Sequence, residues 1–96
     1  MATLSFTETT LASGKTVYVA EIENVKGSIN IDLERSIAGF VKVYHKAHSS
    51  TNYKGGVAAV DSPYVGDVNF NIISEAPNAD MDYKIVSETE ATGIYA

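Results

Sequence analysis

The sequence predicts an all-β fold, a single antiparallel β-sandwich of seven to eight short strands, immunoglobulin-like or jelly-roll-like. Three observations predict it. Apolar and polar residues alternate in several segments, which places alternate side chains on opposite faces of a strand. Turn-forming residues separate these segments at intervals of about ten residues, the spacing typical of sandwiches and barrels. No window has the pattern of an amphipathic helix of useful length.

The clearest strand spans residues 28–34, where Ile29, Ile31 and Leu33 share one face and polar residues occupy the other. Residues 68–72 repeat this pattern. The remaining expected strands are 2–6, 15–23, 40–46, 55–60, 83–88 and 92–95. Turns are expected at 13–14, 24–27, 36–39, 47–54, 61–64 and 76–80, and neither proline falls inside a strand.

The chain has 96 residues and no cysteine. This length fits one domain, residues 1–96, and the composition allows neither a disulfide framework nor a thiolate zinc site. The alternation assigns a core of Leu4, Phe6, Tyr18, Ile22, Ile29, Ile31, Leu33, Val41, Val43, Val68, Phe70, Ile72, Tyr83 and Ile85.

Charge is distributed unevenly along the chain. The formal net charge is -5, with +1 over residues 1–60 and -6 over residues 61–96. Because the cations are few and dispersed along the sequence, we expect neither nucleic acid nor an anionic membrane surface as a partner. The acidic third is interpreted as a solvated face, with docking on a basic surface or cation binding as alternatives.

The sequence offers little for catalysis, and we expect no enzyme and no cofactor. It lacks cysteine and any Gly-x-Ser-x-Gly motif. His45 and His48 have no third ligand at a metal-site spacing and are interpreted as two partly exposed histidines. Asn78, Asp80 and Asp82 resemble the first half of a calcium loop, but the later ligands are missing. An Asx-rich turn is the preferred interpretation.

Tyrosines are the remaining candidates for recognition. Tyr44, Tyr53, Tyr64 and Tyr95 are not all needed inside a core of this size. An exposed ring beside Asn or Asp suits a sugar, with the ring face against the C–H groups, as at Tyr53 and Tyr64. Exposed tyrosine equally suits a protein interface. A third alternative is a nucleic-acid mimic, which needs the acids of 61–96 on one face.

The segment 80–86 places Tyr83 at the start of a late strand after a short acidic turn. This arrangement resembles the tyrosine corner of immunoglobulin-like and fibronectin-like sandwiches. The resemblance implies that the Tyr83 hydroxyl pins the preceding turn.

In overall character the chain resembles accessory structural proteins of tailed-phage virions, such as capsid decoration (cement) proteins. It is a short, acidic β domain rich in Thr, Ser, Asn and Ala. The resemblance implies a non-enzymatic virion subunit, made in the host cytoplasm, that binds a repetitive protein scaffold and forms a homo-oligomer or multi-copy assembly. The alternative is a small carbohydrate-binding or adhesion module.

The N-terminus lacks the features of a secretory signal peptide. Residues 1–10 are expected to form an N-terminal arm that could pair with a neighbour's sheet. On these grounds the candidate partner-binding residues are Leu4, Phe6, Tyr53, Tyr64 and Tyr95.

Overall fold

The computed structural model describes residues 2–62, 66–74 and 76–96, with only the backbone described for 55–62. Within these ranges the chain forms nine strands and no helix, so no described helix could span a membrane. The strands are β1 (Ala2–Leu4), β2 (Thr7–Thr10), β3 (Thr16–Val25), β4 (Ile29–Arg35), β5 (Gly39–Ala47), β6 (Lys54–Ser62), β7 (Gly66–Ile72), β8 (Met81–Ser87) and β9 (Ala91–Tyr95).

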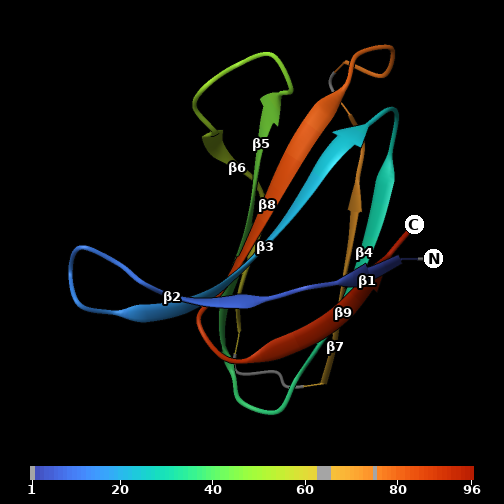
Figure 1. The fold of residues 1–96 in the computed structure, drawn as a ribbon. Coiled ribbons are helices and arrows are strands. Elements are labelled where there is room, and N and C mark those ends of the chain that lie inside the picture. Colours follow the sequence, from blue (N-terminus) through green and yellow to red (C-terminus); the bar gives the residue numbers. More distant parts are fainter. Residues whose placement is uncertain (1, 63–65, 75) are drawn as a thin grey trace.

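The strands form two antiparallel sheets packed as a sandwich (Figure 1), which confirms the predicted fold class. The four-stranded sheet has the order β1-β9-β4-β7, and the five-stranded sheet has the order β2-β3-β8-β5-β6. The turn between β2 and β3 projects away from the body of the sandwich, and the two ends of the chain lie together beside the four-stranded sheet (Figure 1).

The core lies between the sheets and is made by the residues that the alternation selects. On β4, Ile29, Ile31 and Leu33 are buried while the side chains between them face outward. Phe6 and Tyr18, which we expected in the core, are only half-buried. The buried hydrophobic residues that the prediction omitted are Val17, Ala20, Met81 and Ala91.

The N-terminal segment differs from the prediction. The sequence predicts one strand over residues 2–6, but β1 ends at Leu4. The chain then crosses to the other sheet and continues there as β2. β1 pairs with β9 and β2 pairs with β3 of the same chain. The segment expected as an arm for a neighbour is therefore folded into its own sandwich. This division raises the strand count above the predicted seven to eight.

The predicted tyrosine corner is not formed. Tyr83 is fully buried in the core, and its hydroxyl has no hydrogen-bond partner among the described residues. The ring therefore serves as a large core side chain. The turn before β8 is held instead by backbone hydrogen bonds, from the Ala79 amide to the Ala76 carbonyl and from the His48 amide to the Asp80 carbonyl.

Gly93 lies where three strands come close together. A Cβ atom at this position would be 2.6 Å from the Asp32 carbonyl oxygen and 2.6 Å from Cδ2 of Leu33. Leu4 of β1 closes the other side, with its Cδ1 3.1 Å from the same point. The two leucines therefore fill the space above a residue that has no side chain.

We expect Gly93→Ala to lower the free energy of unfolding by about 2 kcal/mol, because the contact with backbone cannot be relieved by a side-chain rotation. Urea denaturation measures the change. The matched control is Thr92→Ala, whose side chain is exposed and whose effect should stay within about 0.5 kcal/mol. Equal stability of Gly93→Ala and the wild type would contradict the packing described here.

Candidate functional site

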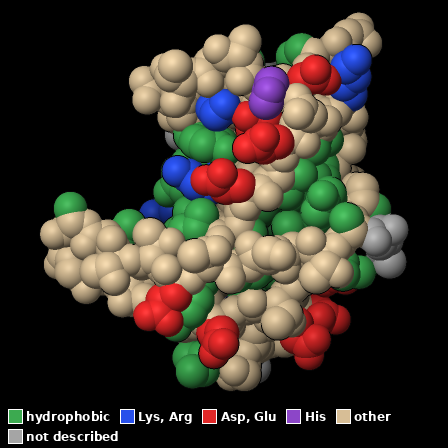
Figure 2. All heavy atoms as spheres, viewed as in Figure 1, with side chains coloured by type: hydrophobic (Ala, Val, Ile, Leu, Met, Phe, Trp, Pro, Cys, Tyr) green, Lys and Arg blue, Asp and Glu red, His purple; other side chains and the backbone are tan. Residues whose placement is uncertain are grey.

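The outer face of the five-stranded sheet carries an open groove of about 510 Å³. This volume lies within the range of about 300–1,000 Å³ that is usual for ligand sites. Figure 2 shows hydrophobic and lysine side chains in the hollow between the projecting β2–β3 turn and the loop that follows β5. The groove is lined by Leu11, Val17, Phe40, Lys42, Tyr44, Tyr53, Lys54, Lys84 and Val86. We call this surface the aromatic–lysine groove.

The groove is formed by side chains that alternate between the core and the outer face along the central strands. On β5, Val41 and Val43 point into the core, so Phe40, Lys42 and Tyr44 point outward. Val17 on β3 is also fully buried, but it lies outside the core cluster and forms part of the groove floor. The strands therefore carry apolar residues on both faces, one set for the core and one for the groove.

Lysine ammonium groups lie against the aromatic rings. Lys84 Nζ is 4.5 Å from the centroid of the Tyr53 ring and 6.0 Å from that of Tyr44. Lys42 Nζ is 5.0 Å from the centroid of the Phe40 ring. These distances fall in the range of cation–π attraction. They hold positive charge beside the rings at the groove surface.

The lysines gather around the groove in the folded chain, although the sequence suggested that the cations are dispersed. The cations are dispersed along the sequence, but five of the six lysines line this groove or contact its rings in the folded chain. Lys15 forms an ion pair with Glu88, and Lys46 forms one with Asp82. Three lysines line the groove itself: Lys42, Lys54 and Lys84. None of them forms an ion pair within the described part of the chain.

Tyr53 remains a neutral phenol over the physiological pH range. Partial burial raises the pKa of its hydroxyl to about 12. Nearby carboxylates act in the same direction and come from Glu21, Asp82 and Glu23. Tyr53 therefore presents a ring face and a hydrogen-bond donor, and no charge.

A buried carboxylate holds the loop that carries Tyr53. Asp82 accepts hydrogen bonds from Lys46 Nζ at 2.8 Å and from the backbone amide of Asn24 at 3.1 Å, and it lies 2.8 Å from His48 Nδ1. Lys46 Nζ also donates to the Ser50 carbonyl at 3.0 Å. These contacts join β3, β5, β8 and the loop after β5 at one end of the groove.

Burial alone would raise the pKa of Asp82. The hydrogen bonds from Lys46, Asn24 and His48 outweigh it and hold that pKa below its ordinary value of 3.8. At the opposite end of the groove, Glu88 accepts from the Phe40 amide at 3.1 Å and pairs with Lys15 at 2.7 Å. The Lys15 hydrogen bond and the Phe40 amide lower the pKa of Glu88 as well.

The predicted partner-binding residues are not brought together. Tyr53 lies in the groove. Leu4 is buried in the core, with 5% of its surface exposed, and lies in the lining of a second hollow on the four-stranded sheet. Phe6 and Tyr95 are half-buried and pack against the core, and Tyr64 lies outside the described residues.

Sequence reasoning missed Phe40, Lys42, Lys84 and the part played by Tyr44. The available signal was the segment 40–46, where aromatic residues share the outward face with lysine. That pattern is unusual for a face exposed to water. Only the strand order places it beside Lys84 of β8 and Tyr53 of the following loop.

The residues considered for metal binding are used otherwise. His45 is buried on the inner side of β5, whereas His48 contacts Asp82. Asp80 is exposed, with one oxygen 3.9 Å from Lys26 Nζ, and Asp82 is occupied by cationic partners. The described residues contain no group of three His, Cys, Asp or Glu that could hold a metal ion.

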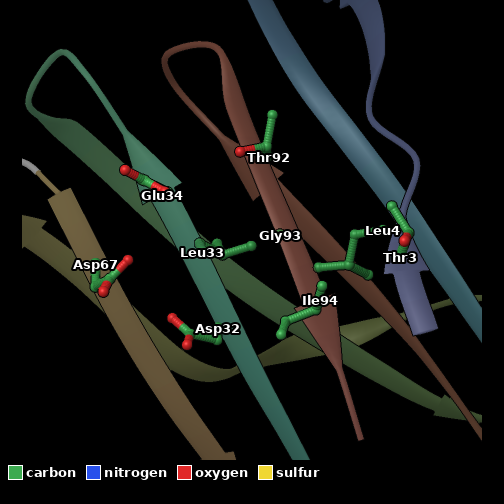
Figure 3. A pocket seen from close by; sticks show the side chains of 9 residues that line it. All are labelled: Thr3, Leu4, Asp32, Leu33, Glu34, Asp67, Thr92, Gly93 and Ile94. Atoms are coloured by element: carbon green, nitrogen blue, oxygen red, sulfur yellow. The ribbon is translucent and has the colours of Figure 1, made fainter. Parts of the chain in front are cut away.

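The outer face of the four-stranded sheet has a second hollow, of about 400 Å³. Figure 3 shows the side chains of Asp32 and Glu34 on β4 and of Asp67 on β7 around it. Glu34 pairs with Asp67 in the strand register. Its lining includes no lysine or arginine, so the linings of the two hollows differ in charge.

The described acids of residues 61–96 do not share one face. Asp67 lies on the four-stranded sheet, whereas Asp82 and Glu88 belong to the five-stranded sheet and its ion pairs. The nucleic-acid mimic required these acids on a single face. The structure therefore removes that alternative.

No family model matches the chain, and no curated protein matches it. Two solved structures are similar, both variants of a family 29 carbohydrate-binding module. Each is 11% identical in sequence. One alignment covers 95% of this chain and 78% of the other, with a TM-score of 0.47. The second covers 94% and 80%, with a TM-score of 0.48.

We expect Asp82→Ala to lower the free energy of unfolding by about 3 kcal/mol, because it leaves the Lys46 ammonium, whose side chain is only 13% exposed, without its carboxylate. The matched control is Asp80→Ala, whose partner Lys26 is largely exposed and whose loss should cost about 0.5 kcal/mol or less. Urea denaturation at neutral pH compares the two. Equal effects would contradict the role given to Asp82.

The pH dependence of stability provides a second measurement on Asp82. Because its folded-state pKa lies below the ordinary value of 3.8, its contribution is present above that pH and is lost as the pH falls through the folded-state pKa. The wild type should therefore lose more stability than Asp82→Asn on acidification. Parallel pH profiles for the two proteins would exclude this linkage.

Proposed function

We propose that this chain is a non-catalytic carbohydrate-binding module whose ligand lies in the aromatic–lysine groove. The observation that carries the proposal is the set of outward rings, Phe40, Tyr44 and Tyr53, around an open groove on a rigid sheet. Sugar rings have apolar C–H faces that leave water when they pack on an aromatic ring. Lysine ammonium groups beside those rings can donate hydrogen bonds to sugar oxygens.

The groove lining supports binding without bond cleavage. Glycosidic hydrolysis generally uses two carboxyl groups that flank the scissile bond. The described lining consists of apolar, tyrosine and lysine side chains, with no carboxylate among them. Of the carboxylates beside the groove, Glu88 and Asp82 are engaged in ion pairs that hold the groove residues in place, and Glu21 faces Lys84 in the strand register.

We expect Tyr53→Ala to weaken polysaccharide binding by about tenfold, because the stacking face is lost. Tyr53→Phe keeps the ring and should bind within a few-fold of the wild type. Affinity electrophoresis in gels that contain soluble neutral or acidic polysaccharides measures both variants. A chain that is retarded by none of the polysaccharides, or equal retardation of Tyr53→Ala and the wild type, would overturn the proposal.

A second candidate function follows from the unlike charges of the two hollows. The acidic hollow around Asp32, Glu34 and Asp67 complements the lysines of the other sheet. Such complementarity favours repeated contacts between copies, or with a scaffold that presents similar surfaces. We propose on this basis the role of a virion accessory subunit, of the capsid decoration type, as the alternative to sugar binding.

The native mass of the purified chain tests this second candidate. We expect a multi-copy species in light scattering, and its mass should fall in high salt because exposed charges are screened. Glu34→Lys, which reverses one charge of the acidic hollow, should reduce the assembly, whereas Glu8→Lys on β2 should not. A monomer at low salt would contradict the alternative.

A further inference from the structure

We infer that the ligand of the aromatic–lysine groove is an acidic polysaccharide, one that carries carboxylate groups on its sugars. This inference rests on the proposed function and specifies its ligand class. The observation behind it is the placement of three lysines among the rings, Lys42, Lys54 and Lys84, in a protein whose net charge is -5.

These three lysines have charge available for a ligand. Lys15 and Lys46, the other lysines near the rings, are paired with Glu88 and Asp82 at 2.7 and 2.8 Å. Lys42 and Lys54 are exposed and Lys84 is half-buried. A carboxylate that approaches them therefore meets ammonium groups that keep most of their hydration and need not break an existing ion pair.

Each ring of the groove has a lysine ammonium group over it. Lys84 Nζ lies within 6.0 Å of the ring centroids of both Tyr44 and Tyr53. A sugar packed on either ring would place an equatorial carboxylate near this ammonium group. Lys42 is placed in the same way over Phe40, with 5.0 Å between its Nζ atom and the ring centroid.

Charge density separates this ligand from a nucleic acid. A single strand combines stackable bases with one phosphate charge per nucleotide, and binding depends on neutralising many of these charges. Here carboxylates border the positive charge of the groove: Glu21 faces Lys84 in the strand register, and Glu88 lies beside Phe40. A few carboxylates spread along a sugar chain suit this pattern better.

The second hollow, which is acidic, supports the placement of an acidic ligand in the aromatic–lysine groove. Its lining on the four-stranded sheet contains three carboxylates, from Asp32, Glu34 and Asp67 (Figure 3). An anionic polymer is repelled there, so the binding orientation is fixed by charge as well as by the rings. The ligand must lie on the five-stranded sheet.

The test compares polygalacturonate with the same polymer after methyl esterification, which removes the charge and keeps the sugar backbone. We expect the full chain to bind polygalacturonate about tenfold or more tightly than the ester in isothermal titration, because the ester cannot accept charge-assisted hydrogen bonds. The affinity for polygalacturonate should also fall with added salt, and the affinity for the ester should not.

Charge-removing variants assign the effect to the groove. Lys42→Gln and Lys84→Gln should each weaken binding of polygalacturonate by about tenfold and weaken binding of the ester by only a few-fold, because a glutamine amide still donates hydrogen bonds to sugar oxygens. Lys26→Gln is the matched control, because Lys26 is exposed in the β3–β4 turn outside the groove. Thermal unfolding confirms that each variant is folded.

The remaining outcomes each overturn the inference in a distinguishable way. Equal affinity for the acid and the ester would refute the acidic ligand and leave a module for neutral sugars. No binding to either polymer or to a panel of neutral polysaccharides would refute the proposed function as well. Tighter binding to oligothymidylate than to polygalacturonate would assign the groove to single-stranded nucleic acid.

Discussion

The buried carboxylate of Asp82 joins the parts of the molecule that form the proposed binding site. It lies on β8, the middle strand of the five-stranded sheet, and takes hydrogen bonds from Lys46 of β5 and from the Asn24 amide at the irregular end of β3. Its contact with His48 fixes the start of the loop that leads to Tyr53. A charge this deep is costly unless it is fully partnered, so the three segments are held in one arrangement. The position of the Tyr53 ring over the groove follows from that arrangement.

Side chains on one face of the five-stranded sheet pack in the core, and those on the other face line the groove. One face of β5 supplies Val41 and Val43 to the core, and the other supplies Phe40 and Tyr44 to the groove. The same division on β8 places Tyr83 and Ile85 inside and Lys84 outside. Because the core packs against the inner face, the outward rings rest on a backbone that has little freedom to move. The proposed binding surface would therefore be preorganised and would need no folding step when a ligand binds.

Much of the fold could be predicted from the sequence, but less of the site. The alternation over 28–34 identified β4 and its buried residues because side-chain direction in a strand depends only on position. It could not show that the chain crosses between sheets after Leu4, since both halves of that segment favour extended backbone. The sequence predicted a tyrosine corner at Tyr83. That contact depends on the geometry of the preceding turn, which a single sequence does not reveal. The groove required strand order, which alone brings Lys84 beside Tyr53 although 31 positions separate them in the chain.

The pairing of the first strand with the last has a consequence for how this domain can be rearranged. Ala2 lies opposite Tyr95 in the register of β1 and β9, and both ends emerge beside the four-stranded sheet (Figure 1), behind the surface that holds the rings. A short linker could therefore close the chain into a ring, and new ends could be opened at the exposed residues 77–80 without separating any paired strands. In such a circular permutant the groove would keep its residues while the points of attachment move to a different corner of the sandwich.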